Sequence, residues 1–221
     1  MILLFAMLQG KRILLNAGPT REFLDPVRYL SNGSSGKMGY ALAEAASAMG
    51  AEVCLVSGPV ALMPPEGVQT ILVVTGDEMY EAMEEKLTAA DWVIGCAAVA
   101  DLAPASANPQ KIKVDKQTGK LSLELRPTRD IIATLAGKRR PGQVFIGFAA
   151  ETQNLETYAK TKLYQKKLDY IVANDVSQPG LGMNADQNAV HIYTTGGQLA
   201  TLGPAPKRQI AEQILAAIES S

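Results

Sequence analysis

The stretch "AGPTREFLDPVRYLSNGSSGKMGYALA", residues 17–43, joins a strand-like pattern to a helical one. The apolar run "RILLN" precedes it, and "GYALA" at its end opens an alanine-rich helical pattern. Between them, Gly33, Gly36 and Gly39 stand where the helix is expected to begin. Small residues there allow backbone N–H groups to approach an anion at the positive end of a helix. The stretch therefore predicts a strand, a phosphate-binding turn and a helix in succession, with a purely structural turn as the alternative.

Neither of two familiar phosphate-binding motifs fits "NGSSGKMG", residues 32–39. A P-loop needs four residues between its glycines and a hydroxyl after its lysine, but Gly33 stands three before Gly36 and Met38 follows the lysine. A dinucleotide fingerprint has G-x-G-x-x-G spacing, whereas the spacing here is G-x-x-G-x-x-G. The acidic residue expected for a ribose is also missing, because the second strand-like run ends "LVSGP". The glycines therefore favour phosphate binding over binding of a nicotinamide dinucleotide.

Strand-like apolar runs alternate with helical patterns along the rest of the chain. The expected strands are 12–18, 51–59, 68–74, 91–99, 143–150 and 168–175, the expected helices are about 36–49, 76–89, 154–168 and 206–219, and a hairpin spans 189–202. This alternation predicts an α/β, Rossmann-like, doubly wound and mostly parallel sheet with helices on both faces. We expect residues 12–221 to form a single domain, with 1–11 as an amino-terminal lead-in or the remnant of a linker.

Residues 101–126 interrupt the alternation and contain no long helical pattern. "KIKV" and "LSLEL" alternate apolar and polar residues around "DKQTGK", which predicts a β-hairpin over 111–125. An excursion of this kind from a compact α/β core is typical of a binding flap or of an arm that reaches a partner subunit.

The composition limits the kinds of partner. The 221 residues are 47% apolar and 19% charged with a net charge of -1, which favours a soluble, cytoplasmic domain that binds neither nucleic acid nor membrane. Cys54 and Cys96 lie in apolar runs and are expected to be reduced core thiols. The single histidine, His191, lies in a strand-like pattern and is expected to be structural, because one histidine cannot build a histidine-rich metal site.

Small and polar residues follow the end of nearly every expected strand. In open parallel sheets, ligands bind beyond the carboxyl ends of the strands. The stretches found there are "AGPTREFLDPVRYLSNGSSGKMG", "SGPV", "CAAVADL", "FAAET" and "ANDVSQPGLGMNADQNA". Their gathering at one edge predicts a single extended site.

Several side chains near these ends are candidate ligand-binding groups. Arg28 and Asn32 suit the recognition of phosphate or carboxylate, although an Arg28–Asp25 pair that stabilises the loop is the alternative. Four lysines fall on the helix expected at 154–168, where they either neutralise a triphosphate or form a solvated face: Lys160, Lys162, Lys166 and Lys167. The polar segment Asn184, Asp186 and Asn188 lacks the pattern of a Ca²⁺ loop and either contacts a nucleobase or forms a surface turn.

Taken in order, the blocks "AGPTREFLDPVRYLSNGSSGKMG", "VSGPV", "GCAAVAD", "KIK", "GFAAET" and "ANDVS" resemble the bacterial phosphopantothenoylcysteine synthetase family. The resemblance covers residues 13–190, nearly the whole chain. It implies a Rossmann-type homodimer that joins 4'-phosphopantothenate to L-cysteine in coenzyme A biosynthesis. It also implies the use of CTP and Mg²⁺, an acyl-cytidylate intermediate, and the release of CMP and pyrophosphate. Bacterial members commonly carry a flavin-dependent decarboxylase half, so this chain is expected either to be fused to or associated with one, or to stand alone.

The resemblance also assigns roles to residues of this chain. It implies that Asn32 holds the acyl intermediate with Arg28 beside it, and that Lys162 assists activation of the nucleotide. The residues implied for nucleotide binding are Gly18, Ser34, Ser35, Gly36, Lys37, Ala149, Ala150, Lys166, Lys167, Asn174, Asp175 and Met183. The residues implied for the pantothenate side are Ala97, Ala98, Val99 and Asp101, with the 111–125 hairpin as the dimerisation flap. The resemblance does not indicate which residues hold Mg²⁺.

Two other functions remain open at this point. An NAD(P)-dependent Rossmann-type oxidoreductase is favoured by the Tyr-x-x-x-Lys spacing of Tyr158 and Lys162, and is disfavoured by the missing ribose acid. A non-catalytic binding module is the other possibility.

Overall fold

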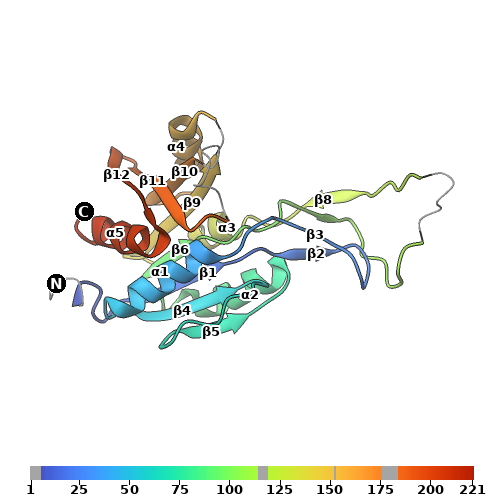
Figure 1. The fold of residues 1–221 in the computed structure, drawn as a ribbon, viewed down its shortest axis with the longest axis horizontal. Helices are drawn as coiled ribbons and strands as arrows, with labels where there is room; N and C mark the ends of the chain where they lie inside the picture. The colour runs from blue at the N-terminus through green and yellow to red at the C-terminus, as the bar shows by residue number, and fades with distance from the viewer. Residues whose placement is uncertain (1–5, 114–118, 152, 176–183) are drawn as a thin grey trace.

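The computed structural model describes residues 6–113, 119–151, 153–175 and 184–221. In the described residues, one eight-stranded sheet runs through the molecule in the order β12-β11-β10-β9-β6-β1-β4-β5 (Figure 1). Its strands are β1 (Arg12–Ala17), β4 (Glu52–Ser57), β5 (Gln69–Leu72), β6 (Trp92–Gly95), β9 (Val144–Glu151), β10 (Tyr170–Asp175), β11 (Gln187–Thr194) and β12 (Gly197–Pro206).

The strand order contains a reversal at β1. The chain passes from β1 to β4 and β5 on one side, and then crosses back to β6, β9 and β10 on the other side, with all of these strands parallel. At the end of this sheet, β11 pairs antiparallel with β10 on one side and with β12 on the other. The carboxyl ends of β1 and β6 therefore form the topological switch point at which open α/β sheets bind their ligands.

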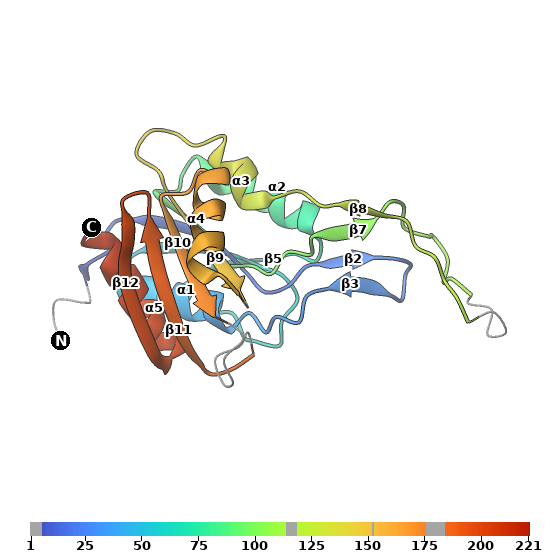
Figure 2. The same ribbon diagram turned by 90° about the horizontal axis from the view of Figure 1, so that it is seen from above.

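Helices cover both faces of the sheet. One face carries α1 (Lys37–Ala48) and α5 (Lys207–Glu219), and the other carries α2 (Gly76–Leu87), α3 (Ile131–Ala136) and α4 (Leu155–Gln165) (Figures 1 and 2). Successive side chains of a strand point to opposite faces of the sheet, so each strand contributes to the hydrophobic core on both faces. Ile13 and Leu15 of β1 pack with α1, whereas Leu14 packs with α2. The predicted doubly wound α/β fold is confirmed, and each predicted helix agrees with an observed helix to within three residues at either end.

A long arm projects from the body of the molecule beside a short hairpin (Figures 1 and 2). The hairpin consists of β2 (Arg21–Phe23) and β3 (Tyr29–Ser31), and the base of the arm pairs β7 (Leu102–Pro104) with β8 (Leu125–Pro127). The predicted strand pairing within 111–125 is wrong for the described part of the arm: 111–113 and 119–124 form no strand, and 114–118 lie outside the described residues.

Packing explains where the arm forms its strand pair. Leu121 and Leu123 are exposed, so the alternating pattern that predicted strands has no apolar face to cover in this chain. By contrast, β7 buries Ala103 beside β2, and pairing occurs there. The short α3 was not predicted, because six residues are too few to establish a helical period.

The loops after β1 and β4 touch backbone to backbone. Gly58 donates its N–H to the carbonyl oxygen of Ala17 at 2.9 Å, and a Cβ at Gly58 would lie 1.9 Å from the carbonyl oxygen of Pro19. A side chain at this position would therefore separate the two loops that lead to the edge of the sheet.

We expect Gly58→Ala to lower the free energy of unfolding by about 1–3 kcal/mol through overpacking, measured by urea denaturation. Gly33→Ala is the matched control, because a Cβ at Gly33 meets no atom within 4 Å; it should change stability by less than about 0.5 kcal/mol. Equal stability of the two variants would contradict this description of the loops.

Candidate active site

Two clefts lie at the carboxyl edge of the sheet. The first, here called the α1 cleft, has a volume of about 160 Å³ and is lined by Ser34, Gly36, Lys37, Met38, Gly39, Cys96, Ala97, Ala98, Phe148, Ala149, Ala150, Asn174, Asn188 and Lys207. The second, here called the α3 cleft, has a volume of about 300 Å³ and is lined by Asn16, Asn32, Gly95, Ala97, Ala98, Val99, Asp101, Thr128, Arg129, Asp130, Ile131, Ile132, Phe148, Ala150 and Lys166. Ala97, Ala98, Phe148 and Ala150 line both clefts, so the two meet at a shared wall.

The shared wall is held to the end of β1 by a buried amide. Asn16, 2% exposed, accepts hydrogen bonds at its Oδ1 from the N–H groups of Cys96 and Ala97 at 2.8 and 2.9 Å. The next N–H, that of Ala98, donates to the carbonyl oxygen of Gly18 at 2.9 Å. The backbone after β6 is thereby fixed against the backbone after β1, although no strand pairing continues there.

Two threonines continue this attachment. Thr20 is fully buried, and its Oγ1 accepts the N–H of Ala100 at 3.0 Å, while its own carbonyl oxygen accepts the Ser31 hydroxyl at 2.7 Å. The Thr128 hydroxyl donates to the carbonyl oxygen of Ala100 at 2.6 Å. These bonds join the segment before α1, the wall and the segment before α3 into one unit.

Asn32 lies where this unit faces the α3 cleft. Its Nδ2 donates to the carbonyl oxygens of Val99 at 2.9 Å and Ala98 at 3.3 Å. The predicted catalytic amide and the predicted substrate-binding residues of the wall are therefore in direct contact.

The turn at the start of α1 depends on two of its three glycines. Gly36 is the N-cap of α1 in a left-handed conformation (φ 75°), and no side chain caps the helix there. A Cβ at Gly39 would lie 2.4 Å from Cβ of Ala17, so the helix can approach β1 only with glycine at this position. A Cβ at Gly33 would meet no atom within 4 Å, so the packing does not require glycine there. The first N–H groups of α1 therefore lie beside the α1 cleft without a capping side chain, which suits an anion.

The loop after β4 packs against the same turn. A Cβ at Gly36 or Gly18 would lie 2.8 or 2.9 Å from Cγ1 of Val60. Ser57 at the end of β4 is buried and shares a hydrogen bond with the Tyr40 hydroxyl. The end of this strand is thus occupied by protein atoms, in the region where a dinucleotide-binding fold would place the acid that binds the ribose.

Lys37, the first residue of α1, pairs with the polar segment near β11. Its Nζ lies 2.6 Å from Oδ1 of Asp186 and donates to the carbonyl oxygen of Asn184 at 3.4 Å. The Lys37 ammonium keeps the pKa of Asp186 below its ordinary value. Asn188 is buried in the lining of the α1 cleft, so this segment borders the candidate site and is not a remote surface turn.

Lys207 also lines the α1 cleft, although its role there was not predicted from the sequence. Lys207 is 6% exposed, and its Nζ donates to the carbonyl oxygen of Ala185. Burial lowers its pKa, and the positive charge of Lys37 acts in the same direction. The available signal was a lysine at the first position of the closing helix, where the helix dipole disfavours a cation.

The lysines within and just after α4 have different partners. Lys166 reaches the α3 cleft and pairs with Asp130 at 3.0 Å. Lys162 pairs with Glu151, at the end of β9, at 2.6 Å. Lys162 and the exposed Lys167 are not among the described residues that line the two clefts.

Arg28 is not among the described residues that line either cleft. Its Nε and Nη2 donate to Oδ2 of Asp25 at 2.9 and 2.5 Å, and Nη2 also donates to the carbonyl oxygen of Ile112 at 2.5 Å. These bonds to the Arg28 guanidinium hold the pKa of Asp25 well below its usual range. The pair ties the β2–β3 hairpin to the arm, and a catalytic role for Arg28 stays a prediction.

The structure places the remaining predicted residues as follows. Ala149 and Asn174 line the α1 cleft, and Asp101 lines the α3 cleft. Gly18 and Ser35 precede α1 and fall outside both linings as described. Asp175 ends β10, but its side chain and all of Met183 lie outside the described residues.

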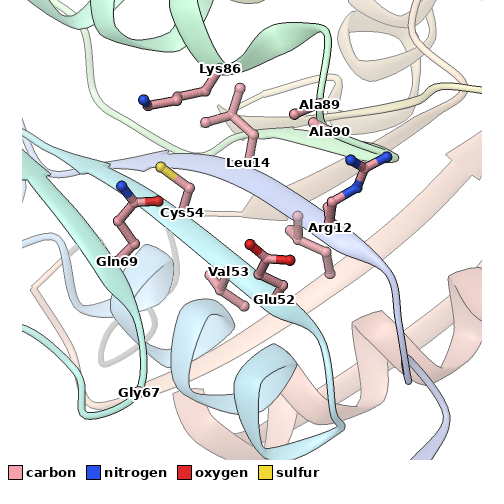
Figure 3. Close-up of a pocket in the computed structure, with 11 residues that line it drawn as sticks. Arg12, Leu14, Glu52, Val53, Cys54, Gly67, Gln69, Lys86, Ala89 and Ala90 are labelled. Atoms are coloured by element: carbon pink, nitrogen blue, oxygen red, sulfur yellow. The ribbon is translucent and has the colours of Figure 1, made fainter.

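A third hollow, of about 200 Å³, lies at the opposite edge of the sheet (Figure 3). Arg12 and Glu52, the first residues of β1 and β4, line it, and Figure 3 shows Lys86 approaching from α2. Burial raises the pKa of the Cys54 thiol in its lining, which disfavours reactivity. Because parallel sheets bind ligands at the carboxyl ends of their strands, this hollow is not part of the candidate site.

Comparison with known proteins identifies the family. Residues 8–221 match the family model described as the DNA/pantothenate metabolism flavoprotein C-terminal domain. The chain belongs to this family. Curated relatives include the coenzyme A biosynthesis bifunctional protein CoaBC of Vibrio cholerae, 50% identical over 192 residues (87% of this chain and 48% of the relative), and that of Bacillus subtilis, 47% identical over 211 residues (95% and 51%). The chain therefore spans about half the length of these relatives.

Solved structures share the fold. The crystal structure of the C-terminal domain of a CoaBC protein is 45% identical with a TM-score of 0.81, covering 97% of this chain and 96% of that one. A Cab2 mutant in complex with phosphopantothenate-cysteine is 18% identical with a TM-score of 0.73, covering 95% of this chain and 86% of that one. The second likeness concerns the fold alone.

The described residues contain neither a metal-ligand cluster nor a membrane-spanning helix. No group of three or more histidine, cysteine, aspartate or glutamate side chains is placed to hold a metal ion in the part of the chain that the structure describes. None of the helices in that part has the length and apolar character needed to cross a membrane.

The Thr20 hydroxyl provides a test of how the wall is held. Thr20→Val keeps the shape but leaves the N–H of Ala100 without its acceptor, so we expect a loss of about 1–3 kcal/mol in the free energy of unfolding. Thr20→Ser keeps the acceptor and should lose less, since it removes only a buried methyl group. Chemical denaturation compares the two; a Val variant more stable than the Ser variant would contradict the assigned role of the hydroxyl.

Proposed function

We propose that the chain is a phosphopantothenate–cysteine ligase of coenzyme A biosynthesis, using CTP to activate the carboxylate of 4'-phosphopantothenate. The observation that carries the proposal is the pair of clefts with a common wall at the carboxyl ends of the strands. The family match and the CoaBC relatives support it.

In the first half-reaction, both reactants are anions. The α1 cleft offers the uncapped N–H groups of α1 and the ammonium of Lys37 to the triphosphate of the nucleotide. The α3 cleft holds the acid, whose carboxylate oxygen attacks the α-phosphorus across the shared wall. A P–O bond breaks, pyrophosphate leaves with the electron pair, and an acyl-cytidylate forms. Holding the two anions in adjoining clefts overcomes the repulsion and the entropy cost of bringing them together.

In the second half-reaction, the amine of cysteine attacks the acyl carbon. An amide C–N bond forms, the C–O bond to the nucleotide breaks, CMP leaves with the electron pair, and the amine gives up a proton. The contact of Asn32 with the wall and its place in the lining of the α3 cleft support a role in this step. Its amide would hold the acyl group while the attack occurs.

The α3 cleft offers two cationic side chains to a substrate with a phosphate and a carboxylate, alongside the carboxylates of Asp101 and Asp130. Lys166 and Arg129 line it, and the guanidinium of Arg129 stacks over the Tyr80 ring at 3.9 Å. Lys162, paired with Glu151 at the end of β9, would exchange this partner for the nucleotide when the site is filled.

CTP and Mg²⁺ are the finer parts of the proposal. Backbone groups of Ala149 and Ala150 in the α1 cleft would read the base. Mg²⁺ commonly binds through phosphates with one or two carboxylates, and it would neutralise part of the charge of the triphosphate. The described lining of the α1 cleft, where the triphosphate is placed, contains no carboxylate, and the described residues offer no all-protein metal cage, so we assign no protein ligands to Mg²⁺.

The assembly is also proposed. The exposed apolar residues of the arm and the β2–β3 hairpin, among them Tyr29, Leu102 and Leu123, suit a homodimer in which each arm packs on the partner. The relatives are bifunctional and about twice the length of this chain, which supports fusion to or association with a second half. A flavin-dependent decarboxylase as that half, and a cytoplasmic location, complete the proposal.

The oxidoreductase alternative lacks support in the site. Tyr158 is 45% exposed, and Lys162, four residues later, pairs with Glu151. Val60 and the buried Ser57 fill the region after β4, where a ribose would be recognised.

Product analysis tests the function. We expect pyrophosphate to be released only when phosphopantothenate, CTP and Mg²⁺ are present together, and CMP to be released only when L-cysteine is also present. Asn32→Asp should lower ligation by about 100-fold or more while still releasing pyrophosphate from the activation step, because the amide acts on the acyl intermediate.

Tyr158→Phe is the matched control, and it should have little effect on a ligase but disable a dehydrogenase that uses this tyrosine. The proposal fails if CTP is not consumed and a nicotinamide cofactor binds tightly instead.

A further inference from the structure

A buried aromatic ring lies against an arginine that lines the α3 cleft. Tyr80 is on α2 and is 5% exposed, and the guanidinium carbon of Arg129 lies 3.9 Å from the centre of its ring. Because α2 and α3 are neighbours on one face of the sheet, a residue just before α3 can reach a ring on α2 (Figure 2). A guanidinium stacked on an aromatic face is held in one plane, whereas an unsupported arginine side chain samples many rotamers.

The hydroxyl end of the same ring is anchored separately. The Tyr80 hydroxyl donates to Oε1 of Glu84 at 2.5 Å and accepts a hydrogen bond from Nζ of Lys138 at 2.8 Å, and Lys138 also pairs with Glu84. The Lys138 ammonium lies 5.5 Å from the ring centre, at the hydroxyl. The ring is therefore fixed at one end, and its face is left to Arg129.

The backbone on either side of Arg129 is fixed as well. The Thr128 hydroxyl donates to the carbonyl oxygen of Ala100 in the wall at 2.6 Å. Asp130 is the N-cap of α3, and its side chain accepts an N–H of the first turn. Arg129 is thus held between the wall and a helix start, and Tyr80 fixes the part that the backbone leaves mobile, the side chain.

Among the described residues, the Arg129 guanidinium has no acid partner. No carboxylate lies within 4.0 Å of it there, and no protein group accepts a hydrogen bond from it. By contrast Lys166, the other cation in the lining of the α3 cleft, pairs with Asp130 at 3.0 Å. Stacking uses the face of a guanidinium, so the N–H groups at its edge can still bind ligand oxygens. Arg129 can therefore bind an anion without giving up a carboxylate.

The place of Arg129 in the cleft favours a phosphate at the far end of the substrate. The residues common to both clefts form the wall at which the carboxylate is activated, and Arg129 is not among them. A substrate with its carboxylate at the wall would extend its other end into the α3 cleft. In the acid of the proposed reaction that end carries a phosphate, and the planar fork of arginine can bind two phosphate oxygens at once.

We propose that Tyr80 is a positioning residue, which holds the Arg129 guanidinium in place to bind the phosphate of the substrate in the α3 cleft. The inference rests on the proposed function for the identity of that substrate. Because the ring orders the guanidinium in advance, the side chain loses little conformational freedom when the phosphate binds.

Calorimetric titration with 4'-phosphopantothenate, with pantothenate, which lacks the phosphate, and with CTP tests the proposal. Arg129→Met should raise the dissociation constant of phosphopantothenate on the order of 10-fold, as for the loss of hydrogen bonds to a charged group, and leave that of pantothenate unchanged. Tyr80→Leu removes the ring and should raise the phosphopantothenate constant about 3- to 5-fold. Tyr80→Phe keeps the ring, so this matched control should bind all three compounds as the wild type does.

A double variant separates positioning from a general structural role. We expect Tyr80→Leu combined with Arg129→Met to bind phosphopantothenate no more weakly than Arg129→Met alone, because the ring acts through the guanidinium. Arg129→Lys tests the same point at an exposed residue without disturbing the core. Lysine keeps the charge but lacks the planar group that stacks, so this variant should weaken binding about as much as Tyr80→Leu does.

Arg139→Met is the control for lost stability. Arg139 stacks over Phe145 at 4.7 Å but is not among the described residues that line either cleft, so this variant should leave the three dissociation constants unchanged.

Additive effects of Tyr80→Leu and Arg129→Met, an equal loss of pantothenate binding, or unchanged binding by Arg129→Met would overturn the inference. Weaker binding of CTP in place of phosphopantothenate would support the positioning role, assign the phosphate to the nucleotide and contradict the placement of the acid in the α3 cleft. Phosphopantothenate binding that depends on both residues in a protein that does not consume CTP would support the inference while refuting the proposed ligase.

Discussion

The buried Asn16 side chain holds the site together. Its Oδ1 accepts the N–H groups of Cys96 and Ala97 just beyond the point where β1 and β6 stop pairing. At a topological switch point the neighbouring loops diverge, and without such an acceptor the backbone after β6 would have two buried donors to satisfy. These hydrogen bonds fix the backbone that forms the wall between the two clefts. Thr20, Thr128 and Asn32 make further hydrogen bonds to the same stretch of backbone.

The second constraint is electrostatic. The whole chain is almost neutral, with a formal net charge of -1, so the positive charge that two anionic substrates require has to be local. Helix starts and lysines provide it, and acids restrain these lysines in the described structure: Asp186 pairs with Lys37, Asp130 with Lys166 and Glu151 with Lys162. Such pairs stabilise the lysines until a phosphate competes for them, and an exposed pair contributes little stability that would oppose the exchange.

The fold was predictable because its signals are local. Strand alternation and helical periods identified the elements of the main sheet, and the gathering of small residues after the strands indicated which edge matters. Gly36 and Gly39 were found as a pattern, and the structure gives each a steric reason. The α3 helix and the pairing at the base of the arm were missed, because one is too short for a period and the other depends on packing against β2. Lys207 was missed because its burial depends on tertiary structure, and its one local signal, a lysine at the first position of the closing helix, does not show that the side chain is buried.

The central claim is that the two clefts activate the acid before the amine takes part. Exchange of labelled pyrophosphate into CTP measures that step alone, because it requires reversible formation of the acyl-cytidylate. The account predicts exchange that depends on phosphopantothenate and Mg²⁺ and proceeds without cysteine. Exchange that appears only after cysteine is added, or that occurs without phosphopantothenate, would contradict it.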